Sequence, residues 1–189
     1  MDLSSVFSIA AAAWGVSEII LGVRTRAKSA TASVRDRGSL VVLWSVIGVA
    51  LVAGVAARAF SSTQIHLSSL WVFAIGLTLL VAGAAIRWLA ILTLGRWFTS
   101  NVAIGPGHRM VQTGIYRYLR HPSYMGMLLA FAGIGMAQRN WLSLAVVMAP
   151  ITAAVLYRIH VEEAALLEAF GQEYRDYRKS TRRLLPGLY

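Results

Sequence analysis

The chain lacks cysteine and carries little charge, and each shortage excludes a class of protein. None of its 189 residues is a cysteine, so disulfides, thiolate metal ligands and a catalytic thiol are excluded. Charged residues make up 14% of the chain, which is less than a soluble domain of this length carries. Because 57% of the residues are hydrophobic, the composition indicates an integral membrane protein.

Acidic residues are also scarce. The chain has 8 of them against 18 lysines and arginines, which gives a formal net charge of +10. In a membrane protein this is the expected cytoplasmic excess of basic residues, and it favours contact with anionic lipids. We therefore expect membrane lipids and not nucleic acid as partners. The preference for arginine over lysine favours a bacterial source and the inner membrane; a eukaryotic chain would lie in the endoplasmic reticulum.

Five apolar runs are separated by polar or turn-forming residues. The first is 20 residues long and spans a hydrocarbon core of about 30 Å at ~1.5 Å per residue. A break of three residues before the last run predicts a helical hairpin. The sequence thus predicts an all-α, polytopic membrane protein with five transmembrane helices, followed by a C-terminal helix. The runs are Leu3–Gly22, Leu40–Ala57, Ser68–Ile86, Tyr124–Ala137 and Trp141–Tyr157.

The distribution of arginine predicts the orientation of these spans. The segment Arg24–Arg37 holds five basic residues and one aspartate, and the segment Arg87–Arg120 is also basic. Loops rich in arginine and lysine stay in the cytoplasm. We predict an outside N-terminus, an inside C-terminus and a site that faces the cytoplasm. Residues 1–94 would form three N-terminal helices, and residues 95–189 a catalytic region within the same structural unit.

The stretch Gly114–Gly126 combines aromatic, basic and turn-forming residues next to an apolar run. Proline suits the first turn of a helix, and the residue before it is driven out of the helical region. A helix should therefore begin at Pro122 or Ser123, with His121 at its mouth. A basic, aromatic membrane-interface belt is the alternative interpretation of this stretch.

The tail after the fifth run shows helical periodicity. Apolar, charged and aromatic residues recur at intervals of four and so share one helix face. Gly171 weakens this helix, yet the pattern continues through it. An i,i+4 salt bridge between the first two residues of the face is the alternative to a binding role. The face consists of Arg158, Glu162, Leu166, Phe170 and Tyr174.

Other features point less strongly to chemistry. Glu18 is an acidic residue inside the first run, where we expect it to snorkel or pair with a nearby arginine. The histidines His108 and His121 make a weak metal pair, and no metal site is predicted. The glycines of Gly105–Gly107 follow no predicted strand, so a dinucleotide-binding turn is disfavoured.

Taken together, these motifs resemble the isoprenylcysteine carboxyl methyltransferase family, to which phospholipid N-methyltransferases are related. The similarity covers about residues 90–189, and the first three helices do not contribute to it. The motifs are Gly114-x-Tyr116-Arg117-x-x-Arg120-His121-Pro122-x-Tyr124-x-Gly126, then Arg158-x-x-x-Glu162-Glu163 and Phe170-Gly171-x-Glu173-Tyr174-x-x-Tyr177.

The resemblance implies an integral membrane enzyme that uses S-adenosyl-L-methionine, enclosed by the long loop, the His-Pro motif and the tail helix. Arg158 would face a substrate carboxylate, and Asn101 would stand in for a glutamine of the family. The acceptor would be a lipophilic small molecule or a prenylated chain that enters from the bilayer. The implied cofactor residues are His108, Arg109, Met110, Val111, Tyr116, His121, Pro122, Ser123, Tyr124 and Glu162.

The charges of the site bear on the reaction. An ionised carboxylate acceptor, such as an isoprenylcysteine-like molecule, needs no base, whereas an amine or thiol does. Glu163 or His121 are the candidate proton acceptors for that second case. The alternatives are a phospholipid or other small-lipid N-, O- or S-methyltransferase, a sterol-type membrane reductase that uses NADPH, and a non-catalytic membrane protein.

Overall fold

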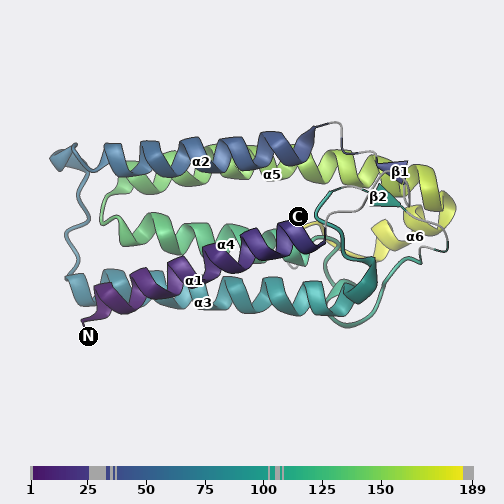
Figure 1. Cartoon of the computed structure of the whole chain (residues 1–189), viewed down its shortest axis with the longest axis horizontal. Coiled ribbons are helices and arrows are strands. Elements are labelled where there is room, and N and C mark those ends of the chain that lie inside the picture. The colour runs from purple at the N-terminus through teal and green to yellow at the C-terminus, as the bar shows by residue number, and fades with distance from the viewer. Residues whose placement is uncertain are drawn as a thin grey trace.

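Six α-helices carry the fold within the part of the chain that the structure describes. The structure is a computed structural model, and it describes residues 2–25, 33–34, 36, 38–101, 103–104, 107 and 109–184. The helices run roughly side by side along the long axis of the molecule, except for the last one (Figure 1). They are α1 (Leu3–Arg24), α2 (Ser39–Ala57), α3 (Ser69–Leu94), α4 (Pro122–Ala137), α5 (Trp141–Phe170) and α6 (Gln172–Ser180).

Local chemistry accounts for where these helices begin. The side chains of Asp2, Ser68 and Asn140 accept a hydrogen bond from a backbone amide in the first turns of α1, α3 and α5. This is the usual N-cap arrangement, which satisfies amides that a helix leaves without a partner. Pro122 occupies the first turn of α4, and His121 before it is not helical. The predicted start of this helix is therefore confirmed.

Among the described residues, four helices are long and apolar enough to cross a membrane. They are α1, α2, α3 with the 3₁₀ turn η2 (Gly95–Trp97), and α5. Helix α4 has 16 residues and is about 24 Å long at ~1.5 Å per residue, short of a core of about 30 Å. The multi-pass membrane architecture is confirmed, and the fifth crossing stays a prediction.

The outer surface of the helices is apolar. Large aliphatic side chains such as Val23, Val52 and Leu92 are more than 70% exposed. Extended apolar surfaces of this kind mark contact with another apolar phase, here the lipid chains. The ionisable residues Glu18, Arg87 and Arg158 of these helices are instead buried, as such residues in membranes usually are.

Small residues determine how closely the helices pack. The main contacts run in the order α2, α5, α4, α3 and α1, so the first two helices of the chain lie at opposite ends of this series. Between α3 and α4, a Cβ at Gly83 would come within 2.5 Å of the Gly126 carbonyl oxygen. Larger residues at either position would push the helices apart, which is why glycine serves at membrane helix contacts. The contact fixes α4, and hence His121, against α3.

One end of the molecule gathers the long connections. There, strand β1 (Ser33–Val34) pairs antiparallel with strand β2 (Ala103–Ile104), which joins the α1–α2 and α3–α4 connections (Figure 1). The 3₁₀ turn η3 (Gly114–Arg117) lies just before α4, while η1 (Ser61–Thr63) belongs to the α2–α3 connection at the other end.

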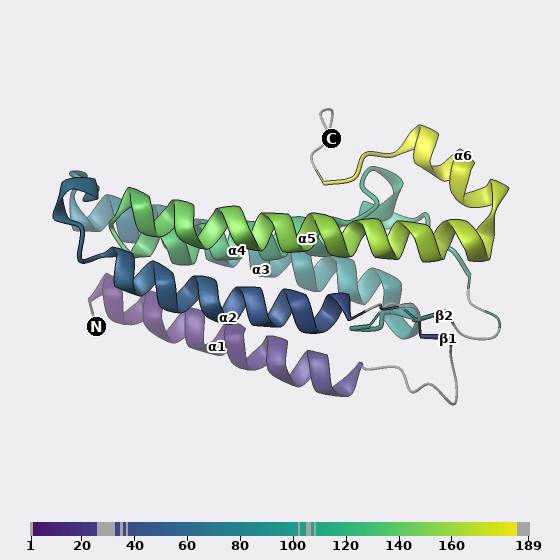
Figure 2. The ribbon, with the colours of Figure 1, turned by 90° about the horizontal axis from the view of Figure 1, so that it is seen from above.

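The C-terminal tail departs from the prediction. Helix α5 ends at Phe170, Gly171 adopts a positive φ of 53°, and α6 turns away from the axis of α5 (Figure 2). The expectation that one helix continues through Gly171 to Tyr174 is therefore wrong. A positive φ carries little strain for glycine and ends helices efficiently. The turn lets the segment after α6 pair with the segment before α4, where the Arg120 amide donates to the Arg182 carbonyl at 2.7 Å.

Candidate active site

A cavity opens at the end of the molecule where the long connections gather. Its volume is about 150 Å³, and it lies between α1, α2, α3, α4, α5, α6 and the loop after α3. Pockets that hold small molecules are concave and mainly apolar, with a few placed polar groups. This cavity fits that description, because leucines and aromatic rings surround a small set of charged side chains. The apolar and aromatic lining includes Leu21, Leu40, Leu43, Trp44, Leu94, Trp97, Phe98, Met127, Leu166 and Phe170.

One face of α5 supplies two charged residues of the cavity. Arg158, Glu162, Leu166 and Phe170 line it, in agreement with the predicted spacing of four. Tyr174 also lines it, although it reaches the cavity from α6 after the turn at Gly171. The five residues predicted to share one helix face therefore all line the cavity, although Tyr174 does so from α6 and not from α5.

The start of α4 faces these charged residues. His121 is 3% exposed, and its Nδ1 lies 4.0 Å from Oε2 of Glu162. The Tyr124 hydroxyl donates to the same Glu162 oxygen at 2.9 Å and accepts from Nε of Arg158 at 2.9 Å. The Tyr124 hydroxyl therefore lies between Arg158 and Glu162 and is hydrogen-bonded to both. This bridge takes the place of the direct i,i+4 salt bridge that was the alternative interpretation.

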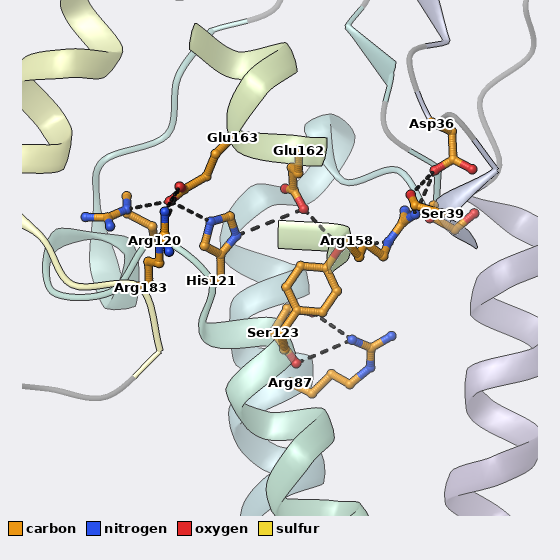
Figure 3. A network of polar contacts seen from close by, with 12 residues as sticks. Asp36, Ser39, Arg87, Arg120, His121, Ser123, Arg158, Glu162, Glu163 and Arg183 are labelled. Carbon is orange, nitrogen blue, oxygen red and sulfur yellow. Dashed lines mark hydrogen bonds and ion pairs between the residues drawn. The ribbon is translucent and has the colours of Figure 1, made fainter. Parts of the chain in front are cut away.

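Arg158 is a buried cation of the cavity with several hydrogen-bond partners. The residue is 2% exposed, and its guanidinium makes contacts on three sides (Figure 3). Nη1 donates to Oδ1 of Asp36 at 2.6 Å and to Oγ of Ser39 at 2.8 Å, and Nη2 donates to the Ser100 carbonyl. A buried cation of this kind is stable only with such partners.

Glu163 lies next to Glu162 in the sequence but points to a different set of partners. Its carboxylate accepts from Nε of Arg120 at 3.0 Å and from Nη2 of Arg183 at 2.8 Å, and it lies 3.4 Å from Nε2 of His121 (Figure 3). Glu163 is 5% exposed and is absent from the lining of the cavity. These ion pairs tie the C-terminal segment and the segment before α4 to α5.

Another buried ion pair, between Glu18 and Arg87, joins α1 to α3. Glu18 accepts from Nε of Arg87, and from Nη2 of Arg87 at 2.6 Å, so the fork of the guanidinium faces the carboxylate. Nη1 of Arg87 donates to Oγ of Ser123 at 2.8 Å. The expected pairing of Glu18 with an arginine is confirmed, and the pair also holds the first turn of α4. Both Glu18 and Arg87 line the cavity.

The buried tyrosines close the cavity on the side of α6. Burial raises the pKa of Tyr116, and the charge of Glu162 adds to the rise. Burial likewise raises the pKa of Tyr174 and of Tyr177. Each phenol therefore stays neutral, and the Tyr177 hydroxyl donates to the Tyr116 carbonyl at 2.7 Å. That bond connects α6 to η3.

Most of the residues implied by the resemblance converge on this cavity. Pro122 instead fills the first turn of α4 and is fully buried, while His108 lies outside the described residues. Asn101, implied only by its place in the loop, also lines the cavity. The implied residues found in the lining are Arg109, Met110, Val111, Tyr116, His121, Ser123, Tyr124, Arg158 and Glu162.

Comparison with known proteins decides the family. A sequence model of the Isoprenylcysteine carboxyl methyltransferase (ICMT) family matches residues 74–168, half of the chain. The chain belongs to this family. The resemblance in the sequence is thereby confirmed, although the match begins earlier than expected and ends before α6.

Several ICMT relatives are about one-third identical to this chain over the aligned region. Protein-S-isoprenylcysteine O-methyltransferase A of Arabidopsis thaliana is 36% identical over 112 residues, which are 58% of this chain and 57% of that protein. A probable protein-S-isoprenylcysteine O-methyltransferase of Oryza sativa subsp. japonica is 34% identical over 114 residues, 59% of this chain and 60% of that protein. The chain thus spans about 60% of these relatives.

A solved structure supports the same assignment. The structure of the eukaryotic intramembrane Ras methyltransferase ICMT is 33% identical to this chain, with a TM-score of 0.55. The likeness covers 62% of this chain and 43% of the other. This ICMT relative is a membrane protein, in keeping with the multi-pass architecture seen here.

Sequence reasoning missed two residues from outside the matched region that bind Arg158. Asp36 lies in the connection between α1 and α2, and Ser39 is the first residue of α2. One signal was available for Asp36, because it is the single acidic residue in the basic segment Arg24–Arg37. For Arg87 the only signal was its place at the end of an apolar run.

Proposed function

We propose that this ICMT-family protein is a membrane methyltransferase that transfers the methyl group of S-adenosyl-L-methionine to the carboxylate of a lipophilic, isoprenylcysteine-like acceptor. The observation that carries the proposal is the buried Arg158, which lies in a mainly apolar cavity beside the Tyr124–Glu162 pair. A buried guanidinium recognises carboxylates by a forked contact, and apolar walls suit a lipid chain.

The residues around Glu162 fit the proposed donor. Tyr124 and His121 both approach Oε2 of Glu162, so Oε1 can accept a hydrogen bond from a ligand hydroxyl or amino group. Aromatic rings nearby, including Tyr116 and Phe170, offer faces for a purine and for a cation. When bound, the donor supplies an electrophilic methyl group on a sulfonium. We keep His108 in the proposed donor site on the resemblance alone.

Arg158 would orient the acceptor. An ionised carboxylate is already a nucleophile, so the protein has to position it and exclude water, and positioning alone can contribute about 7–11 kcal/mol. This reaction needs no base, and Glu163 is held by Arg120 and Arg183. We therefore propose that Glu163 stabilises the site and does not take a proton. The acceptor chain would lie along Leu21, Leu43 and Met127, having entered from the bilayer.

We propose that the cavity faces the cytoplasm of a cell membrane. The connections at the cavity end carry most of the arginines, while the α2–α3 connection at the other end is poor in them. Reporter fusions after Gln64 and after Arg178 test this orientation. We expect a cytosolic signal only from the second fusion, and a cytosolic signal after Gln64 would refute it.

Two measurements on the detergent-purified chain test the function. The first follows transfer of a labelled methyl group to an S-farnesylated N-acetylcysteine and to a membrane lipid extract. The second follows thermal stabilisation by S-adenosylhomocysteine and, separately, by NADPH. We expect transfer to the farnesylated acid and stabilisation by the homocysteine compound, which His121→Ala should weaken by about tenfold through loss of its contact with Glu162.

The same measurements separate the alternatives. Methylation of phospholipid amines without methylation of the acid would assign the chain to the N-methyltransferases. Stabilisation by NADPH alone would support a reductase. A folded protein that responds to neither ligand and transfers no methyl group would be non-catalytic. The exposed substitution Asp176→Asn on α6 serves as the control for a lost carboxylate away from the cavity.

A further inference from the structure

The guanidinium of Arg158 already holds a carboxylate, and that carboxylate belongs to the chain itself. Arg158 donates four hydrogen bonds, to the Tyr124 hydroxyl, Asp36, Ser39 and the Ser100 carbonyl. A guanidinium has five N–H donors, so an incoming carboxylate cannot make a forked contact while all four bonds persist. Of these partners, Asp36 is the one with the chemistry of the proposed acceptor.

The position of Asp36 gives its carboxylate a second place to bind. Oδ2 accepts from the Leu40 amide at 3.1 Å, and Oδ1 accepts from Oγ of Ser39 at 3.0 Å as well as from Arg158. Leu40 and Ser39 form the first turn of α2, where free amides and the helix dipole favour an anion. The carboxylate can therefore give up Arg158 and remain bound to the start of the helix.

The charges around Arg158 favour such an exchange over simple addition. Asp36 contacts this cation directly, and Glu162 contacts it through the Tyr124 hydroxyl. An acceptor carboxylate added to this group would place a third anion around one buried cation. Like charges in a poorly solvated site repel strongly, so one of the anions has to move away from the guanidinium.

We propose, resting on the function proposed above, that Asp36 is a specificity-determining residue that occupies on Arg158 the place of the acceptor carboxylate. A charged acceptor binds by displacing Asp36 from Nη1. Methyl transfer breaks the sulfur–carbon bond, leaves its electron pair on sulfur, and forms a carbon–oxygen bond to the acceptor. The ester product is neutral, so Asp36 returns to Arg158 and helps to expel it.

This exchange predicts how the native chain discriminates between acid and ester. In the wild-type protein, the binding free energy that the acid gains from its charge is offset by the loss of the ion pair between Asp36 and Arg158. We therefore expect S-farnesylated N-acetylcysteine and its methyl ester to bind with affinities within about threefold of each other. Binding is measured by thermal-shift titration in the presence of S-adenosylhomocysteine, which prevents turnover.

The decisive variant is Asp36→Asn. The amide oxygen of asparagine can still accept from the Leu40 amide, and its NH₂ group can donate to Oγ of Ser39, so the start of α2 is preserved, while the competing charge is removed. We expect the acid to bind about tenfold tighter or more relative to the ester, since a charged partner makes the stronger bond to arginine. In turnover, KM for the acid should fall, and kcat should fall as well because the product leaves more slowly. Asp176→Asn should change none of these values.

Three results would overturn the proposal. One is an unchanged acid-to-ester ratio in Asp36→Asn, and another is a weaker affinity for the acid; either would make Asp36 a permanent partner of Arg158. The third result needs no variant. If the wild-type protein binds the acid more than about thirtyfold tighter than the ester, the Asp36 carboxylate does not compete with the acid for Arg158. Failure of the proposed function looks different, because wild type would then show neither methyl transfer nor stabilisation by S-adenosylhomocysteine.

Discussion

Replacing Glu18 by glutamine should destabilise the protein severely, because it leaves Arg87 buried without its counter-ion. Arg87 is 6% exposed, and two of its nitrogens contact the Glu18 carboxylate. Glutamine offers one acceptor oxygen and turns an NH₂ group toward a cation. Breaking a buried ion pair from one side costs about 3–5 kcal/mol. We expect a loss of this size in the free energy of unfolding, which is roughly a hundredfold or more in the folded-to-unfolded ratio.

A double substitution separates the charge effect from simple loss of packing. Glu18→Leu with Arg87→Leu removes both charges together, and buried pairs replaced by apolar residues are often neutral in stability. We expect the double variant to lie within about 1.5 kcal/mol of wild type, allowing for the lost bond from Arg87 to Ser123. The coupling energy of the two sites should then exceed about 2 kcal/mol.

The assay is equilibrium unfolding in mixed micelles, followed by helical circular dichroism and by tryptophan fluorescence. Asp176→Asn, which removes an exposed carboxylate from α6, gives the baseline for a lost charge. The reasoning fails if Glu18→Gln costs less than about 1 kcal/mol, which is the range of an exposed pair. It also fails if the double variant loses as much stability as the single variants Glu18→Leu and Arg87→Leu lose in sum.

Further predictions concern the cavity and its tyrosines. Arg158→Lys keeps the positive charge but loses the forked hydrogen-bonding geometry of the guanidinium. Turnover should therefore fall by about tenfold or more, while the affinity for S-adenosylhomocysteine changes little. Activity near wild type would make Arg158 a merely structural cation. Glu162→Gln should weaken binding of S-adenosylhomocysteine by about tenfold in calorimetric titration, since a carboxylate bond to a ligand contributes roughly 1.5–3 kcal/mol, and unchanged affinity would place the donor elsewhere. Burial raises the pKa of three tyrosines above the pKa that they have in the unfolded chain. The tyrosines of the unfolded state therefore lose their protons first as the pH rises, and the stability of the folded protein should fall above a pH of about 10. Tyrosinate absorbance should lag behind free tyrosine until the protein unfolds, and titration of all seven tyrosines together at pH 10 would contradict this. These three are Tyr116, Tyr174 and Tyr177.

The amino-acid sequence by itself determined the features that depend on near neighbours. Apolar runs specified the helices, because length and hydropathy decide what can lie in a bilayer. Pro122 specified the start of α4, since its ring has no amide to donate. A spacing of four put Arg158, Glu162 and Phe170 on one side of α5, where all three line the cavity.

Only the tertiary structure decided which distant groups meet. Arg158 finds Asp36 across 122 positions, and Arg87 finds Glu18 across 69. Such pairs depend on which helices are neighbours, and no local period encodes that. Here α2 packs on α5 and α1 packs on α3, and the positive φ of Gly171 turns the tail back toward the segment before α4. Glu162 and Glu163, adjacent in the sequence, differ in their partners: one helix position faces the cavity, and the next faces Arg120 and Arg183.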